Sequence, residues 1–252
     1  MATLGHSLVL VTPTHKADFT EQEEIFLGIS LEFNSDLTHC FVVPDNLDIT
    51  KISQKFKNSQ FKRMPKEYFQ SAKAYNRLML SGLFYEQFAN YQYLLVLQLD
   101  ALVLRSIRSE DYVGYDYVGA PWRKTLRVST YKRDLHANNK RLFWLPYLAV
   151  SVGNGGLSFR KIYVFLELLR KSELKKFDSR VWDGSHNEDF VISYFLKKFK
   201  YRVPSKRNAG IIFQEEDFKY CVDTKALLGV HAPDKYNPIL TDQLIQALCQ
   251  KK

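Results

Sequence analysis

An alternation of short apolar runs with helical patterns limits the fold more than any other feature of this chain. Thr20 and Glu23 have the spacing of a capping box and predict a helix that continues to about Phe33. Residues 71–90 carry apolar side chains at helical spacing and predict a second, long helix. Three apolar runs around these helices predict buried strands: residues 8–11, 40–43 and 93–97. Strands that alternate with helices form a mostly parallel sheet flanked by helices, so we predict an α/β fold.

The second half of the chain alternates less regularly. Residues 112–122 contain Gly and aromatic side chains without a helical period, and residues 123–141 are basic and polar, so we predict a loop or a flap there. The further elements that we predict are a strand at 157–159, helices at 161–171 and from Asn187, apolar segments at 211–213 and 227–230, and a terminal helix at 241–249.

No internal repeat or linker divides the chain. We therefore predict one domain over residues 1–252. In this interpretation about 1–105 form a nucleotide-binding half, and about 106–252 form an acceptor and catalytic half.

The composition fits a compact protein of the reducing cytoplasm. Of the 252 residues, 46% are hydrophobic, which is enough for a sizeable core. Cys40, Cys221 and Cys249 lie far apart, without the spacing of a metal site or a disulfide framework. Residues 1–16 lack the basic start of a signal peptide, and no apolar run of ~18 residues predicts a membrane span. We therefore expect a cytoplasmic protein.

The net charge of the chain is +9, and Lys and Arg cluster in three segments, at residues 62–66, 123–133 and 197–207. Such a surplus favours anionic partners: nucleic acid, acidic lipid headgroups or phosphorylated small molecules. Each segment alone is equally well explained as a solvated basic surface. No nucleic-acid-binding motif is visible in the sequence, so we expect no nucleic-acid partner and keep peripheral contact with an anionic membrane as a hypothesis.

Asp100 interrupts the most strand-like segment of the chain, with Gln98 two positions before it. A carboxylate just past the carboxyl end of a central parallel strand lies in the crevice where open α/β sheets bind ligands. There it can hold Mg²⁺ or Mn²⁺, which need only one or two protein carboxylates when phosphate oxygens and water complete the shell. The alternative is an Asp that caps a turn at the end of the strand.

A second candidate is the glycine-rich segment Gly153, Asn154, Gly155 and Gly156. Glycine lets the backbone approach a ligand closely because it has no Cβ. The spacing matches neither a dinucleotide fingerprint nor a P-loop, and a tight turn explains it equally well.

Two further candidates lie later in the chain: Asn187, Glu188 and Asp189 at a predicted helix start, and His231 after an apolar run. Acids in a first helical turn complement the helix dipole, but a carboxylate can also take a proton from an attacking hydroxyl. A lone His is commonly a surface or packing residue, but its neutral imidazole can complete a Mn²⁺ shell beside one carboxylate.

The joint order of these pieces resembles a family of mostly bacterial GT-A-type glycosyltransferases long catalogued as a domain of unknown function (DUF5672-like). The stretches that carry the resemblance are SAKAYNRLMLSGLFYEQFANYQYLLVLQLDALVL, YDYVGAPW, VGNGGLSFR, HNED and GVHAPDKY, within about residues 69–236. The resemblance implies a single GT-A-like domain that binds a nucleoside-diphosphate sugar, with a divalent cation, Mn²⁺ or Mg²⁺, as cofactor.

Residue by residue, the resemblance implies a donor site and a metal site. Gln98, Leu99 and Asp100 stand at the D-x-D motif of the family; Gln98 replaces its first acid, and Asp100 keeps the metal-binding one. His231 matches a second metal ligand. Further nucleotide-sugar contacts are implied at Thr12, Pro13, Thr14, Asn76 and Arg77. The loop beside the donor sugar and the acceptor is implied at Gly153, Asn154, Gly155, Gly156 and Asn187, with Trp122 as a stacking surface or a core aromatic.

The resemblance also implies a reaction. Asp189 is the expected base, with Glu188 as the competing candidate, in an inverting transfer of a sugar to a hydroxyl of a glycan or lipid-linked glycan. The setting would be capsule, lipopolysaccharide or similar polysaccharide biosynthesis at the inner membrane face, with a UDP-sugar as the favoured donor. A retaining transferase and a non-catalytic nucleotide-sugar or polyanion-binding module stay open as alternatives.

Overall fold

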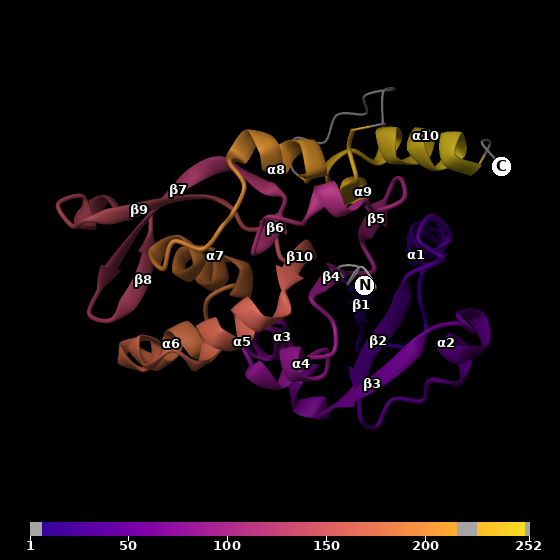
Figure 1. Ribbon diagram of the computed structural model, residues 1–252, viewed down its shortest axis with the longest axis horizontal. Coiled ribbons are helices and arrows are strands. Elements are labelled where there is room, and N and C mark those ends of the chain that lie inside the picture. The colour runs from indigo at the N-terminus through magenta and orange to yellow at the C-terminus, as the bar shows by residue number, and fades with distance from the viewer. Residues whose placement is uncertain (1–6, 216–225, 250–252) are drawn as a thin grey trace, which may run out of the picture.

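The computed structural model describes residues 7–215 and 226–249. A six-stranded sheet in the order β3-β2-β1-β4-β10-β6 crosses the middle of the molecule (Figure 1). Its strands are β1 (Leu8–Pro13), β2 (Thr38–Pro44), β3 (Gln60–Met64), β4 (Tyr93–Leu97), β6 (Tyr117–Gly119) and β10 (Leu157–Lys161). Strands β1 to β4 pair in parallel, whereas β10 is antiparallel to both β4 and β6. The sheet is therefore mostly parallel, as predicted.

Both faces of this sheet are buried, which explains why its strands are apolar without interruption. Val9 and Val11 pack into one hydrophobic cluster, and Leu8 and Leu10 pack into another on the opposite face. The helices that surround the sheet are α1 (Glu21–Glu32), α2 (Thr50–Lys55), α3 (Ala72–Met79), α4 (Gly82–Glu86), α5 (Ile162–Arg170), α6 (Ser179–Trp182), α7 (Glu188–Lys198), α8 (Lys206–Ile212), α9 (Pro233–Tyr236) and α10 (Pro238–Cys249). None of the helices in the described ranges is long and apolar enough to span a bilayer.

The predicted capping box at the start of α1 is confirmed. The hydroxyl of Thr20 accepts a hydrogen bond from the backbone N–H of Glu23, and the Glu23 carboxylate accepts one from the N–H of Thr20, at 3.2 and 2.8 Å. These two bonds satisfy helix donors that have no partner inside the first turn.

The prediction of one helix over residues 71–90 is wrong. Helix α3 ends at Met79, and the short helix α4 begins at Gly82. Ser81 starts the second helix, because its hydroxyl accepts a hydrogen bond from the N–H of Leu83 at 3.1 Å. A serine side chain that bonds the backbone in this way favours a new helix start over a continued helix.

The prediction of a loop over residues 123–141 is also wrong. Strands β7 (Pro121–Tyr131), β8 (Asp134–Ala137) and β9 (Tyr147–Val152) form an antiparallel sheet in the order β8-β7-β9, which projects from the body at the left of Figure 1. Buried Val128, Leu135 and Val150 join this sheet to the core. We call residues 121–152 the arm. A register shift between Pro121 and Leu126 interrupts the alternation of polar and apolar side chains that would have indicated a strand.

A third, small sheet brings the end of the chain back to the central strands. It consists of β11 (Phe213–Gln214), β12 (Gly229–His231) and β5 (Ala101–Val103). His231 pairs with Ala101, and the N–H of Ala232 donates a hydrogen bond to the carbonyl of Asp100 at 2.8 Å. Because β5 follows β4 almost directly, this pairing sets His231 beside the end of β4.

Candidate functional site

A cleft of about 470 Å³ opens where β1 and β4 end and α3 begins. Ligands of open α/β sheets bind at such an edge, beyond the carboxyl ends of the parallel strands. The structure brings Pro13, Thr14, Gln98 and Asp100, which the resemblance assigns to one site, into the wall of this cleft. The other lining residues are His15, Lys16, Glu23, Phe69, Gln70, Ser71, Ala72, Tyr75 and Leu99.

Three residues expected at this site do not line the cleft. Thr12 is fully buried, and its hydroxyl lies 3.0 Å from Nε2 of His39, whose pKa is lowered to about 3 by burial. Asn76 donates a hydrogen bond to the carbonyl of Gly184 at 3.2 Å and so ties α3 to the loop before α7. Arg77 is exposed. On α3 it is instead Tyr75 that faces the cleft.

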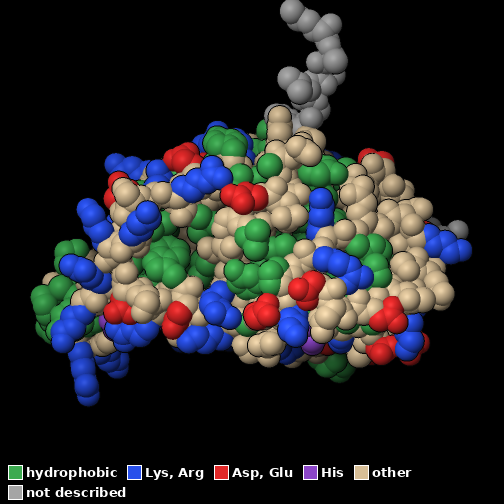
Figure 2. Space-filling view, turned by 90° about the horizontal axis from the view of Figure 1, so that it is seen from below, with side chains coloured by type: hydrophobic (Ala, Val, Ile, Leu, Met, Phe, Trp, Pro, Cys, Tyr) green, Lys and Arg blue, Asp and Glu red, His purple; other side chains and the backbone are tan. Residues whose placement is uncertain are grey.

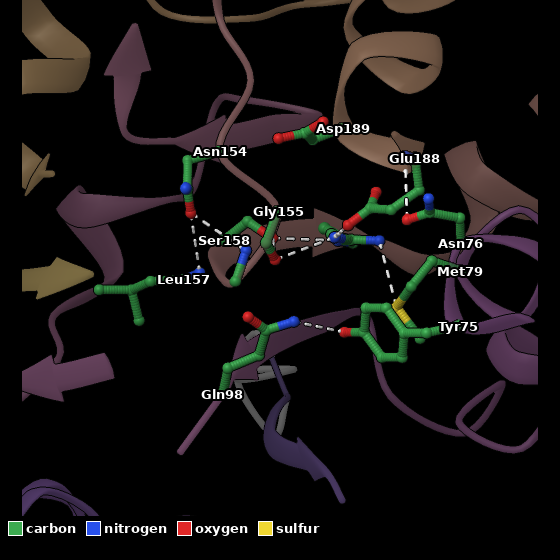
Figure 3. Close-up of polar contacts among 12 residues, drawn as sticks. Tyr75, Asn76, Met79, Gln98, Asn154, Gly155, Leu157, Ser158, Glu188 and Asp189 are labelled. Carbon is green, nitrogen blue, oxygen red and sulfur yellow. Dashed lines mark hydrogen bonds and ion pairs between the residues drawn. The ribbon is translucent and has the colours of Figure 1, made fainter. Parts of the chain in front are cut away.

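Behind the part of the cleft wall that Gln98 and Asp100 form, His231 brings one nitrogen to their two side-chain oxygens. Nε2 of His231 lies 3.3 Å from Oδ1 of Asp100 and 3.3 Å from Oε1 of Gln98. Gln98 cannot turn freely, because its Nε2 donates a hydrogen bond to the hydroxyl of Tyr75 at 2.8 Å (Figure 3). Partial burial opposes ionisation of Asp100, but its contact with His231 outweighs this and lowers the pKa of Asp100.

The other nitrogen of His231 has two polar neighbours. Nδ1 lies 3.0 Å from Nδ2 of Asn154 and 3.0 Å from Oε1 of Glu215. Burial alone would lower the pKa of His231, but Asp100 and Glu215 raise it to about 9. Sequence reasoning did not find Glu215. The signal available was its position two residues after a short apolar run that ends at Phe213.

This donor set fits a small divalent cation. Carboxylate and amide oxygens with one imidazole are ligands that suit Mn²⁺ and Mg²⁺. Within the described ranges, no group of three or more His, Cys, Asp and Glu side chains could hold a metal ion. A cation here would therefore need Gln98, water and ligand oxygens in addition to Asp100 and His231.

The predicted glycine loop lies between this group and α7, and two of its glycines are required by close contacts. A Cβ on Gly156 would collide with Nε2 of His231 and with Oε1 of Gln98. A Cβ on Gly155 would collide with the carboxylate of Glu188. The side-chain oxygen of Asn154 accepts hydrogen bonds from the N–H groups of Gly156 and Leu157, which fixes the loop (Figure 3). The loop is thus the common wall of two polar groups.

Glu188 forms a buried ion pair with Arg160. Nη2 of Arg160 donates to Oε1 of Glu188 at 3.1 Å, and both side chains are almost completely buried. The guanidinium also donates to the hydroxyls of Ser158 and Tyr85 and to the carbonyl of Gly155. The second oxygen of Glu188, Oε2, is buried and has no hydrogen-bond partner among the described residues. This leaves one buried acceptor unfilled beside the glycine loop.

Asp189 lies in a different environment from its neighbour. Its carboxylate points away from Glu188 (Figure 3) and accepts a hydrogen bond from the N–H of Phe190 at 2.6 Å. Desolvation, followed by the negative charge of Glu188, raises the pKa of Asp189 to about 7, and Glu215 contributes in the same direction. Glu215 therefore links Asp189 electrostatically to the His231 group.

The two remaining candidates border the same loop. Trp122 is partly buried, and a Cβ on Gly153 would collide with its ring. Asn187 is exposed and precedes α7 without capping it through its side chain. Asp100 and His231 are thus in direct contact, and the glycine loop joins them to Glu188 and Trp122.

Comparisons with solved structures identify the fold. Core-mannan synthase A (CmsA/Ktr4) from Aspergillus fumigatus, in its Mn/GDP form, superposes with a TM-score of 0.50 at 13% identity over 78% of this chain and 71% of that chain. A 4-diphosphocytidyl-2C-methyl-D-erythritol synthase superposes with a TM-score of only 0.39 at 14% identity, over 68% and 83%. No curated protein matches the sequence. The fold is GT-A-like, as the resemblance implied.

A family profile matches residues 58–231, which include the cleft edge at Gln98 and Asp100, the glycine loop, Asp189 and His231. The family is described as "Protein of unknown function (DUF5672)". The match covers more than half of the chain, and the chain is therefore a member of the DUF5672 family.

Proposed function

We propose that this protein is an inverting glycosyltransferase that moves a sugar from a nucleoside diphosphate to a hydroxyl of a glycan acceptor. The observation that carries the proposal is the shared glycine loop. One side of it packs against Gln98 and His231 at the end of the cleft, and the other side packs against Glu188, next to Asp189. A donor in the cleft would therefore have its diphosphate near the first group and its sugar near the second.

The cleft suits a nucleoside diphosphate. Its wall includes Ser71 and Ala72 at the start of α3, where backbone N–H groups and the helix dipole favour negative charge. Gln98, Asp100 and His231 are the residues that would hold a Mn²⁺ or Mg²⁺ ion. When bound, such an ion neutralises charge that develops on the leaving diphosphate. We expect a UDP-sugar, and the Mn/GDP form of the mannan synthase makes a GDP-sugar the next donor to test.

Asp189 is the base in this proposal. The acceptor hydroxyl oxygen forms a bond to the anomeric carbon while the bond from that carbon to the diphosphate oxygen breaks. The bonding pair leaves with the diphosphate, and the hydroxyl proton goes to Asp189. A carboxylate with a pKa of about 7 is a stronger proton acceptor than an ordinary Asp and is still ionised in half of the molecules near neutral pH.

Glu188 is the weaker candidate for the base. Its Oε1 is bound to Arg160, and both side chains are enclosed. We therefore assign Glu188 the task of holding Arg160 and the glycine loop in position.

Transfer can be tested by measuring nucleotide release from a panel of UDP-, GDP-, dTDP- and CDP-sugars with Mn²⁺. Asp189→Asn should lower turnover by about 10² to 10⁴ while donor affinity changes little. Asp36→Asn is a matched control, because Asp36 is an exposed acid after α1. Near-normal turnover of Asp189→Asn would remove Asp189 as the base. The anomeric configuration of the product, read by NMR, decides between inversion and retention.

The alternative is a nucleotide-sugar-binding module without catalysis. One observation favours it: Gln98 brings a neutral amide, held by Tyr75, to the position where the motif has an acid. Saturable donor binding with no hydrolysis or transfer for any donor in the panel would support this alternative.

A further inference from the structure

The arm carries a large share of the positive charge of the molecule. Residues 121–152 contain seven Lys and Arg, all with exposed side chains, against one acid, Asp134. Asp134 is buried and contacts His186 and Arg180 at 2.8 and 3.3 Å, so its charge is balanced inside the fold. The outer surface of the arm is therefore strongly cationic.

The connection between β8 and β9 adds an apolar tip to this cationic surface. Residues 142–146 have the sequence LFWLP and include no polar side chain. Phe143 and Trp144 are 77% and 63% exposed, and Tyr147 follows at 48%. Figure 2 shows a group of apolar side chains at the left end of the molecule, with Lys and Arg next to it. Leaving two large aromatic side chains in water is unfavourable unless a partner covers them.

We propose that the arm docks on the surface of an anionic lipid bilayer, with Phe143 and Trp144 in the headgroup region. Aromatic side chains with one apolar and one polar end prefer that region, and Trp is enriched there. Lysine and arginine next to it gain attraction from acidic headgroups within a Debye length. Lys140 and Arg141 directly precede the apolar tip, so both kinds of contact are available to the same short segment.

Two other partners fit this surface less well. Single-stranded nucleic acid would form ion pairs with the cations and stack on the aromatic rings. It would gain nothing from Leu142, Leu145 and Pro146, whose side chains neither stack on bases nor form hydrogen bonds with them. A second copy of the chain, docked through the same patch, would bring two strongly cationic arms together, which is unfavourable. An anionic bilayer satisfies the charge and the apolar tip at once.

The root of the arm lies at the candidate site. Trp122 is the second residue of β7, and its ring is in contact range of Gly153 in the glycine loop. A link between docking and the acceptor rests on the proposed transferase function. Docking through the arm would hold the acceptor side of the site close to the membrane, which suits a sugar acceptor linked to a lipid.

Co-sedimentation with vesicles tests docking without any assay of turnover. We expect the intact protein to bind phosphatidylglycerol-containing vesicles and to bind pure phosphatidylcholine vesicles at least about tenfold more weakly. Lys140→Gln with Arg141→Gln should weaken binding to the anionic vesicles roughly 25-fold. Lys57→Gln with Lys66→Gln is the matched control, because these exposed lysines are near α2 and β3, away from the arm (Figure 1). Equal losses for both pairs would overturn the proposal.

The tip can be followed by its own fluorescence. Trp144 is exposed, whereas Trp122 and Trp182 are partly buried, so insertion should shift the emission to shorter wavelength. The shift should disappear in Trp144→Phe, which keeps an aromatic ring and is expected to bind vesicles almost as well. An unchanged spectrum at saturating vesicles, or tighter binding to poly-uridine than to vesicles, would contradict docking. Vesicle binding with no donor turnover would refute the transferase and leave docking intact.

Discussion

At the scale of single residues, two adjacent carboxyl groups at the start of α7 have opposite surroundings. Glu188 is enclosed and shares a hydrogen bond with the buried guanidinium of Arg160. Asp189 points away from that pair, and desolvation together with the charge of Glu188 raises its pKa to about 7. The first environment favours a structural partner for Arg160, whereas the second favours a group that exchanges protons near neutral pH.

The raised pKa of Asp189 predicts a stability effect with a definite sign. In the folded state Asp189 holds its proton up to about pH 7, whereas in the unfolded chain it loses it near its ordinary pKa, so ionisation above that value destabilises the fold. Near pH 8, Asp189→Asn should therefore have a free energy of unfolding about 2 kcal/mol larger than that of the native chain, after allowance for screening, and should unfold at a higher temperature. Near pH 4, where Asp189 is protonated in the folded state, the two proteins should be equally stable. Calorimetry at the two pH values measures this, and a variant that is less stable near pH 8 would contradict the assigned environment.

The same pKa predicts the pH dependence of activity. If Asp189 is the base, kcat/KM should rise with pH, reach half of its plateau at about pH 7, and stay flat above it, because only the ionised carboxylate accepts the proton. The rates should be measured at saturating cation, so that loss of metal at low pH does not imitate the effect. A profile that is flat from pH 5 to pH 8 would exclude a base with this pKa.

Removing Glu188 should damage the fold itself. Glu188→Ala leaves Arg160 buried without its anion, which costs about 3 to 5 kcal/mol. Glu86→Ala breaks an exposed ion pair with Arg170 and should cost less than about 1 kcal/mol. Urea unfolding of both variants compares the two pairs directly. Equal, small losses would mean that the Arg160 pair is not structural.

The sequence singled out Asp100, Asp189 and His231 as candidates because each follows or begins a regular element, and their roles stay predictions. It did not predict Glu215, since Gln214, Glu215, Glu216 and Asp217 look like a solvated acidic run. Thr12 was expected in the cleft because it ends an apolar strand. Alternation along β1 instead turns its hydroxyl to His39, which a single strand pattern cannot reveal.

At the scale of elements, the glycine loop and the small third sheet assemble the site from distant parts of the chain. Gly156 lies against the side chains of Gln98 and His231, which belong to the end of β4 and to β12. A side chain at position 156 would separate these residues without entering the hydrophobic core.

We predict that Gly156→Ala lowers the affinity for Mn²⁺ by about 10- to 100-fold, since it displaces the side chains that would hold the ion. Gly28→Ala in α1 is the matched control. A Cβ there has no neighbour within 4 Å, and alanine in a helix should stabilise the protein by up to about 1 kcal/mol. Titration calorimetry with Mn²⁺ measures both. Unchanged affinity in Gly156→Ala would exclude a cation at Gln98 and His231.

The sequence predicts helices and strands well where the apolar side chains follow one period over a whole segment. It predicts them less well where a local hydrogen bond or a register shift interrupts that period. The first strands and α1 match their patterns because both faces of the sheet are buried and the capping box is complete. The segment 71–90 forms two helices because the side chain of Ser81 accepts a local hydrogen bond and starts a new helix. A hydrophobic period does not detect such a bond. The strands of the arm were not predicted, because the register shift between Pro121 and Leu126 breaks the alternation of polar and apolar side chains.

At the scale of the whole molecule, the α/β class followed from the sequence, but the direction of β10 did not. Strand β10 runs antiparallel between β4 and β6, and this reversal positions the glycine loop directly at the end of β4. The direction of a strand depends on where its connections cross the sheet. Composition and period do not record that, so the closeness of Asn154 and His231 was not predictable.

Binding of donor and cation should stabilise the whole molecule. At a nucleotide concentration near 100 times its Kd, the gain is about 2.7 kcal/mol, which raises Tm by several degrees for a chain of this size. We expect UDP or GDP with Mn²⁺ to do this and EDTA to reverse most of the shift. In Asp100→Ala, neither UDP nor GDP with Mn²⁺ should raise Tm, as measured by thermal-shift fluorescence. A full shift in Asp100→Ala would move the cation to another site.

The position of Asn154 has a consequence for the proton on His231. Because the oxygen of Asn154 is held by two backbone N–H groups, its amide cannot flip, and its NH₂ must face Nδ1. An NH₂ group cannot accept a proton from Nδ1, which leaves Glu215 as the acceptor. Because Asp100 and Glu215 raise the pKa of His231 to about 9, the ring carries protons on both nitrogens near neutral pH, and Nε2 has no lone pair for a cation. Loading of the cation would thus release the Nε2 proton of His231 while Nδ1 keeps its bond to Glu215, which ¹⁵N shifts of the imidazole would reveal.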